Sequence, residues 1–243
     1  MALPIITVMK HELTLPSSGE KLTFRPFLVK EEKILMMALQ SGEAKDMVRG
    51  LKEIVVNCIE KDIKVNSLPP FDLEYIFLQL RARSVGDVIP ISYSIPTEMC
   101  KDDKKECTFE KELNLDDIAV QKDENHKDLI DLTDSIKLKM KYPDMETAAT
   151  MTGVEGVEMV NKTFDLIGQC IEYIMDGDEM HNLSDYTKKE ADDFLNSLST
   201  QNFKEIQTFF DTMPKLKHEI TARCKVCGKE NTRVLEGMGD FFL

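Results

Sequence analysis

Two cysteines near the end of this 243-residue chain constrain its fold more than any other feature. Cys224 and Cys227 are separated by two residues, are followed at once by Gly228, and lie between two short runs of β-prone residues. This spacing is typical of a zinc knuckle, in which two strands meet at a tight turn that directs both thiolates to one ion. Gly228 supplies the positive φ that such a turn needs. A structural zinc site has four ligands, so the other two must come from elsewhere.

A second cysteine pair, Cys100 and Cys107, lies in the middle of the chain, and its flanking segments also resemble strands that meet at a polar turn. The spacing within this pair is wider than in a usual knuckle. We nevertheless predict that two hairpins distant in sequence face each other across one structural Zn²⁺ ion, and that all four thiolates bind it. Such a site would fasten the middle of the chain to its end.

Two other interpretations of these thiols remain open. They can be ordinary buried or surface cysteines in a reducing compartment, because a free cysteine behaves as a small hydrophobic residue. A thioredoxin-like redox pair requires the second cysteine to lead into a helix, whereas residues 228–232 resemble a turn and residues 233–235 an extended segment. Cys58 and Cys170 lie on the apolar sides of predicted helices and are interpreted as packed thiols.

Composition narrows the class of protein. The chain has 31 basic and 44 acidic side chains, a formal net charge of −13, and this balance argues against nucleic-acid binding, which depends on clustered lysine and arginine. The start of the chain does not resemble a secretory signal, and no apolar run approaches the roughly 20 residues of a membrane span. Together with the six cysteines, these features predict a cytosolic protein without a membrane partner.

Hydrophobic periodicity predicts an α+β fold of mostly helical layers, with short antiparallel hairpins that form a zinc-ribbon-like module. Alternating apolar residues on both sides of the turn at residues 17–20 indicate an N-terminal hairpin. Apolar spacings of three and four, together with capping and stop signals, predict six helices, at residues 30–40, 45–64, 72–83, 155–175, 187–198 and 203–213. Asp72 is expected to cap the third of them. The β-prone runs are residues 88–93, 107–115 and 136–142.

The chain is accordingly predicted to have four regions, which together form one or two compact domains. They are an N-terminal hairpin and helical region (1–87), a β region with the first cysteine pair (88–145), a helical region (146–213), and a C-terminal zinc knuckle with an apolar tail (214–243). The tail ends in Phe241, Phe242 and Leu243 and is expected to dock onto the protein's own core or into a partner's groove.

No pattern in the sequence indicates catalysis. There is no nucleophile elbow, no glycine-rich phosphate loop and no His-Glu-x-x-His pair, and His126 lies alone in a polar loop where it is expected to face water. Asp176, Gly177 and Asp178 resemble the start of a calcium loop but lack its later ligands, so they are interpreted as a turn. A closed shell of four thiolates also leaves no position for an activated water. The sequence therefore predicts a protein that is not an enzyme.

Five stretches resemble the baseplate hub subunit family of T-even-type bacteriophages, which includes a related hub assembly factor. They are residues 22–36, 77–86, 213–218, 224–228 and 240–242, and the first is the most distinctive. The resemblance extends over nearly the whole chain. It implies a role in building the central hub of a contractile tail baseplate, through contacts with other hub and baseplate proteins. It also implies action in the cytoplasm of the infected cell and then in the virion.

An interface is predicted in the first of these stretches, where Phe24 and Phe27 flank Arg25, because arginine beside aromatic residues is typical of interface hot spots. Phe241 and Phe242 are the other candidates for partner contacts. The alternative function is a zinc-ribbon protein that binds nucleic acid or assists transcription, which the thiol pairs alone would permit and salt-sensitive binding to DNA or RNA would reveal. A metal-dependent hydrolase would require a second ion with an open coordination position.

Overall fold

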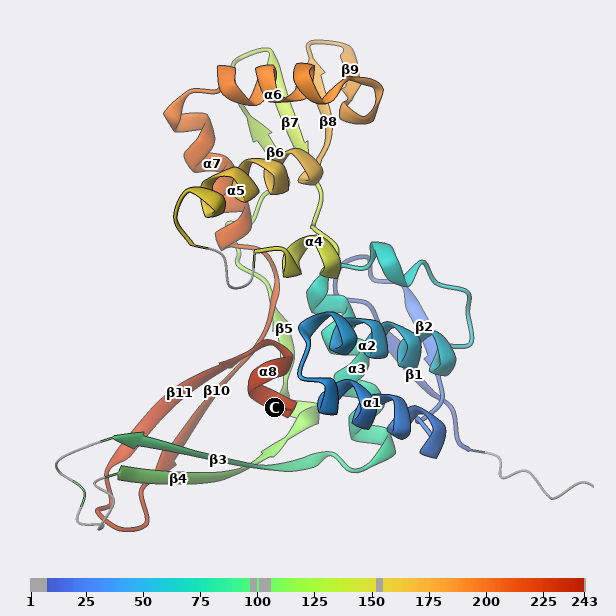
Figure 1. The fold of residues 1–243 in the computed structure, drawn as a ribbon, viewed down its shortest axis with the longest axis vertical. Coiled ribbons are helices and arrows are strands. Elements are labelled where there is room, and N and C mark those ends of the chain that lie inside the picture. Colours follow the sequence, from blue (N-terminus) through green and yellow to red (C-terminus); the bar gives the residue numbers. More distant parts are fainter. Residues whose placement is uncertain (1–7, 97–99, 101–105, 152–154, 243) are drawn as a thin grey trace, which may run out of the picture. The chain divides into compact units, whose positions relative to one another are not determined.

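The structure is a computed structural model that describes residues 8–96, 100, 106–151 and 155–242, and the chain divides into two compact units (Figure 1). Unit 1 is built from three segments of the chain and unit 2 from two. The segments of unit 1 are Met1–Val65, Phe71–Gln121 and Lys215–Leu243, and those of unit 2 are Asn66–Pro70 and Lys122–Pro214. Helices combine with short antiparallel sheets in both units, which confirms the predicted α+β class.

Unit 1 contains helices, a β-hairpin and two further small sheets. Its elements are β1 (His11–Thr14), β2 (Lys21–Phe24), α1 (Val29–Ser41), α2 (Ala44–Cys58), α3 (Pro70–Ser84), β3 (Val88–Pro96), β4 (Glu106–Asn114), η2 (Leu115–Asp117), β5 (Ala119–Gln121), β10 (Lys215–Arg223), β11 (Glu230–Glu236) and α8 (Gly237–Phe242). The short turn η1 (Val65–Ser67) spans the sequence boundary with unit 2. Among the described residues, no helix is long and apolar enough to cross a membrane.

Two of the three sheets of unit 1 share one buried core. The hairpin β3–β4 makes one sheet, and β10 pairs with both β11 and β5 in the other. Side chains from both sheets, from α3 and from α8 pack into one buried cluster that includes Leu78, Phe109, Leu113, Ile220 and Phe241. The apolar tail thus docks onto the protein's own core through Phe241, which is 4% exposed.

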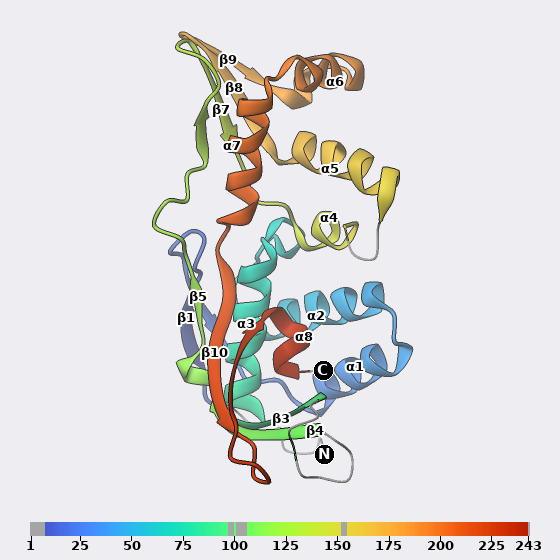
Figure 2. The same ribbon diagram turned by 90° about the vertical axis from the view of Figure 1, so that its left-hand side faces the viewer.

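Unit 2 is a four-stranded antiparallel sheet packed against helices (Figure 2). Its elements are β6 (Leu129–Asp131), β7 (Ile136–Met140), α4 (Met145–Ala149), α5 (Gly156–Cys170), β8 (Ile171–Asp176), β9 (Glu179–Asn182), η3 (Leu183–Asp185), α6 (Lys188–Ser197) and α7 (Thr200–Asp211). The sheet order is β6-β7-β8-β9. Leu138 and Ile174 of the sheet share a core with Ile167, Leu195 and Phe209 of the helices.

The helix predicted over residues 155–175 is too long. Helix α5 ends at Cys170, and the next residue already begins strand β8, which pairs with β7. Ile171 and Ile174 continue the helical spacing, but β-branched and aromatic residues also suit a strand with a partner, so sheet pairing overrides helix periodicity. The turn predicted at Asp176 is confirmed, since Asp176 pairs with Glu179 and Gly177 has a φ of 60°.

Two predicted details at other helix ends are also corrected. Helix α2 ends at Cys58 and not at residue 64, because Ile59 leaves the helix and forms a β-bridge with Phe24. Asp72 was expected to cap α3, but its carboxylate lies inside the unit, where it accepts hydrogen bonds from the backbone N–H and the hydroxyl of Ser17. Asp72 therefore fastens the β1–β2 turn to α3. Its pKa is raised, mainly because of burial.

A buried ion pair joins the end of β2 to the start of α1. The guanidinium of Arg25 lies 2.9 Å from a carboxylate oxygen of Glu31 and also donates to the carbonyl of Asn57 at 2.8 Å. Glu31 is fully buried and accepts a further hydrogen bond from the Leu28 N–H, at the first turn of α1. Burial alone raises the pKa of Glu31, but these hydrogen bonds, together with Lys30, outweigh it and lower the pKa.

We expect Arg25→Ala to lower the free energy of unfolding of unit 1 by about 3 kcal/mol at pH 7, because it leaves a buried carboxylate without its partner. Lys30→Ala is the matched control, because Lys30 also contacts Glu31 but its side chain is 66% exposed. Denaturant titration of both variants measures the difference.

The same pair predicts a pH dependence. Since the folded-state pKa of Glu31 is lowered, its contribution to stability is present above the unfolded value of about 4.3 and is lost as the pH falls through the folded value. The difference in unfolding free energy between the wild type and Glu31→Gln should therefore be largest at pH 7 and shrink below about pH 4. A constant difference across this range would contradict the assignment.

Candidate metal centre

The β3–β4 and β10–β11 hairpins bring the four predicted ligand cysteines together. Cys100 lies in the connection from β3 to β4, Cys107 is the second residue of β4, and Cys224 and Cys227 occupy the turn from β10 to β11. The ends of both hairpins lie at the same side of unit 1 (Figures 1 and 2). All four sulfur atoms lie within 4.8 Å of one another, although Cys100 and Cys224 are 124 residues apart.

The sulfur positions fit a tetrahedral metal ion. A Zn–S bond of about 2.3 Å places the sulfur atoms of a tetrahedral site about 3.8 Å apart. The Sγ atoms of Cys100 and Cys224 are 3.8 Å apart, and those of Cys107 and Cys227 are 3.5 Å apart. Each of these pairs has one member on each hairpin. An ion at the centre of the cluster would therefore crosslink the two hairpins.

Backbone hydrogen bonds close a tight turn that contains Cys224 and Cys227. The Cys224 N–H donates to the Lys229 carbonyl at 2.8 Å, and the Gly228 N–H donates to the Cys224 carbonyl at 2.9 Å. Gly228 has a φ of 75°, and a Cβ at this position would meet nothing within 4 Å. The need for glycine is therefore conformational and not steric.

An aromatic contact within the β3–β4 hairpin and two contacts from that hairpin to β11 support the cluster. The rings of Tyr93 and Phe109 are stacked at 5.1 Å, and the Tyr93 hydroxyl donates to the side chain of Asn231 on β11 at 3.0 Å. The Arg233 guanidinium lies 5.2 Å from the centre of the Tyr93 ring. Because these groups hold both hairpins in place, the cysteines are positioned by the fold as well as by any ion.

The thiols of Cys107 and Cys224 differ in acidity. Burial and the neighbouring thiols raise the pKa of Cys107 to about 12. The backbone N–H of Cys227 lowers the pKa of Cys224 to about 6. Four thiolates at such short distances repel one another, and a divalent cation among them would remove this repulsion and ionise every thiol. Cys100, Cys107 and Cys224 are buried and Cys227 is exposed, so the site opens to solvent on one side.

The other predicted contact residues do not gather at one place on the surface. Phe24 and Phe27 are 1% and 8% exposed, so most of their area packs inside unit 1. Arg25 is held by Glu31, as described above. Phe241 belongs to the core, and the side chain of Phe242 lies outside the described residues. The interface assigned to these residues stays a prediction.

His126 occupies a more enclosed position than the sequence predicts. Its Nδ1 lies 2.9 Å from the Thr212 hydroxyl and its Nε2 lies 3.0 Å from the Tyr142 hydroxyl. The ring also packs against Tyr142 and Phe209. Burial lowers its pKa, so His126 is a neutral structural residue of unit 2. A polar loop sequence gave no sign of this, because the partners are distant in sequence.

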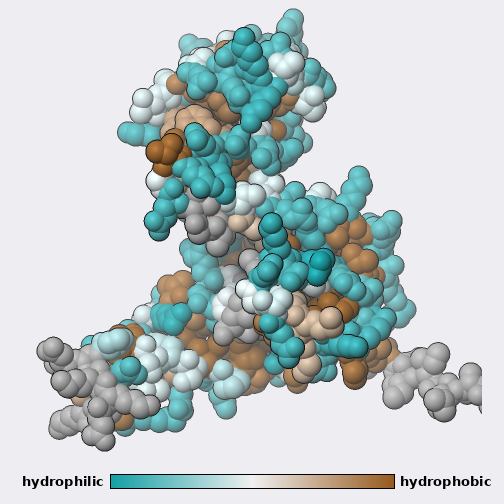
Figure 3. All heavy atoms as spheres, viewed as in Figure 1, coloured by the Kyte–Doolittle hydropathy of each residue, from teal (hydrophilic) through white to brown (hydrophobic). Residues whose placement is uncertain are grey.

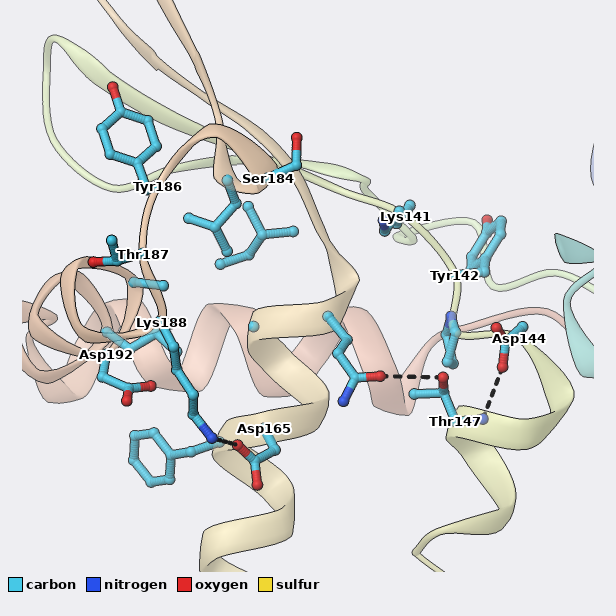
Figure 4. Close-up of a pocket in the computed structure, with 18 of the residues that line it drawn as sticks. Lys141, Tyr142, Asp144, Thr147, Asp165, Ser184, Tyr186, Thr187, Lys188 and Asp192 are labelled. Carbon is cyan, nitrogen blue, oxygen red and sulfur yellow. Dashed lines mark hydrogen bonds and ion pairs between the residues drawn. The ribbon is translucent and has the colours of Figure 1, made fainter.

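Unit 2 also contains a cleft of about 630 Å³ (Figure 4). Several of its polar groups have structural partners. Asp144 accepts from the Thr147 N–H at 2.7 Å and begins α4, and Asp165 lies 3.3 Å from the amine of Lys188. Thr187 forms a capping box at the start of α6. These contacts assign the named side chains to helix termini and an ion pair.

Comparison with known proteins identifies the family. A family model described as T4 bacteriophage base plate protein matches residues 8–243. The chain belongs to this family. The match confirms the predicted resemblance at the level of a phage baseplate protein. Neither the curated proteins nor the solved structures gave a match.

Membership in the T4 baseplate family also bears on role and partners. A baseplate protein is a component of the phage tail. Membership in this family indicates a structural rather than a catalytic role. It implies contacts with other baseplate proteins of the phage. The match includes both cysteine pairs, so the sulfur cluster lies within the region of the chain that the family model covers.

We expect the purified baseplate family protein to bind about one divalent ion per chain, and Cys107→Ser or Cys224→Ser to bind much less, because each variant removes a thiolate from a four-ligand site. Co²⁺ is a suitable probe, since thiolate coordination gives it a characteristic absorption. Cys58→Ser and Cys170→Ser are the matched controls, as both thiols are buried outside the cluster. Equal metal content in all four variants would contradict a metal site at these cysteines.

Proposed function

We propose that this protein is a structural or assembly component of the central hub of a phage baseplate, and that a structural Zn²⁺ ion holds its hairpins rigid for contacts with other hub proteins. The observation that carries the proposal is the convergence of Cys100 and Cys107 with Cys224 and Cys227 in a member of the T4 baseplate family. The assignment to the hub rests on the resemblance of the quoted stretches, of which residues 22–36 are the most distinctive.

Zinc is the proposed ion for chemical reasons. Thiolates are soft ligands, and four of them in a tetrahedral arrangement select Zn²⁺ over the oxygen-binding ions Mg²⁺ and Ca²⁺. Four protein ligands also complete the coordination shell, so the ion would stabilise the fold and would hold no reactive water. In this arrangement, Cys100, Cys107, Cys224 and Cys227 act together as a zinc-ribbon-like crosslink between the two hairpins.

The charges around the knuckle argue against the alternative of a nucleic-acid-binding zinc ribbon. Arg223 is paired with Glu230 at 2.9 Å, and Lys225 is paired with Glu110. Arg233 lies 3.0 Å from Asp240. These acidic partners neutralise basic side chains that would otherwise be available to phosphates. A salt-sensitive shift of DNA or RNA in a gel would favour the alternative.

We expect removal of zinc by a chelator to increase hydrogen exchange in β3, β4, β10 and β11 while the exchange of β7 and β8 in unit 2 changes little. Structural zinc contributes folding free energy to the segments that it crosslinks, and the strands of unit 2 contain none of the four ligands. Mass spectrometry of the exchanged protein measures both regions in the same sample. Uniform protection in unit 1 after metal loss would contradict a stabilising role.

The role in assembly is tested by complementation of a phage that lacks this gene. Cys227→Ser should fail to restore baseplate hubs, whereas Cys58→Ser, which also removes a thiol but lies outside the cluster, should restore them. Mass spectrometry of purified particles then separates a subunit that remains in the virion from a factor that leaves after assembly. Normal particles from Cys227→Ser would overturn the proposed link between the cluster and the hub.

A further inference from the structure

Helix α1 exposes more large apolar side chains than a surface helix normally does. Five of them lie in or next to this helix: Leu28, Val29, Met36, Met37 and Leu39, with exposures of 40%, 79%, 57%, 63% and 41%. Figure 3 shows hydrophobic side chains among hydrophilic ones over the helices of unit 1. Summed over the five residues, these exposures amount to on the order of 500 Å², which equals the largest apolar patch of a typical monomer, and exposed apolar surface of this size marks interaction sites.

The packing of α1 against α2 defines which face is free. Glu31 and Ala38 are buried, and a Cβ added at Gly50 of α2 would lie 3.1 Å from the Cβ of Ala38. With 3.6 residues per turn, the opposite face carries Val29, Met36 and Gln40 in one stripe. The free face therefore has an apolar stripe with one polar residue at its end.

Two opposite charges flank this stripe. Glu32 lies on one side of the Val29–Met36 line and Lys33 on the other, and both are exposed. The chain as a whole carries a formal charge of −13, but these flanking charges balance. A second copy of the chain can therefore approach this face without repulsion between like charges. A basic partner, attracted by the net negative charge of the chain, would instead bind an acidic face.

We propose that the α1 face is an interface between two copies of this chain, in which the two α1 helices pack in parallel about a two-fold axis. In this arrangement, Val29 and Met36 face their counterparts. The two-fold axis brings the Glu32 side of each helix against the Lys33 side of the other, so Glu32 lies beside Lys33 of the second copy. Charged residues lie beside the apolar seam of a parallel coiled coil in the same way.

The size of the patch sets the expected strength. A standard interface buries about 800 Å² on each partner, so this patch forms the apolar centre of a small interface whose rim is polar. We expect a reversible dimer with a Kd on the order of micromolar, which sedimentation equilibrium of the full-length, metal-loaded chain measures directly. A monomer at all concentrations up to about 100 times that value would overturn the proposal.

Met36→Glu should weaken the dimer at least tenfold, because it places two like charges at the centre of the interface. The matched control is Met180→Glu on β9 of unit 2, where the methionine has a similar exposure of 60%. Because Met36 is 57% exposed, the variant should fold normally, and circular dichroism verifies this. If both variants weaken the dimer equally, the interface lies elsewhere and the proposal is wrong.

A charge exchange tests the arrangement itself. Glu32→Lys and Lys33→Glu should each weaken the dimer, since each brings like charges together twice across the two-fold axis. The double variant Glu32→Lys with Lys33→Glu should restore it, because opposite charges again face each other. Additive weakening in the double variant would overturn the parallel pairing. These outcomes concern self-association alone, so they are distinguishable from any failure of the proposed hub function.

Discussion

Contact between two hairpins that are far apart in the sequence is the constraint on which unit 1 depends. The β3–β4 and β10–β11 hairpins share an apolar core, and the sulfur atoms of Cys100, Cys107, Cys224 and Cys227 converge at their ends. Neither hairpin has enough buried surface to be stable alone, because an isolated two-stranded hairpin is marginal in water. The core, the Tyr93 contacts and the thiol cluster therefore act together, and each holds the others in register.

Charge plays a similar structural part in the N-terminal region of unit 1. Glu31 is completely buried, and Arg25 links it to the end of α2 through the carbonyl of Asn57. The distinctive Phe24-Arg25-Pro26-Phe27 stretch thus has a role within the fold itself: both aromatic side chains are largely buried, and the arginine neutralises a carboxylate. This accounts for the sequence pattern without requiring a partner.

Local patterns predicted local structure well. The N-terminal hairpin, the helices α1, α6 and α7, and the knuckle turn at Gly228 all follow from spacing, capping and glycine signals within a few residues. Failures arose where a distant partner decides the outcome. Ile171 and Ile174 suit both a helix and a strand until β7 is available to pair with them. His126 looked solvent-exposed because Tyr142 and Phe209 are brought to it by the fold. The Glu31 contact with the Leu28 N–H was missed because Leu28 lacks the hydroxyl or carboxylate that marks a capping box.

Cys227 is the cysteine of the cluster that is most accessible to reagents in solution. The other three sulfurs are buried, so a reagent that attacks thiolates in solution meets Cys227 first. Oxidation at this one position would remove a ligand while leaving the hydrophobic layer beneath it intact. Under oxidising conditions, the stability of the hairpin pair therefore depends on whether Cys227 stays reduced. A neighbouring protein that covers Cys227 would protect it from oxidants.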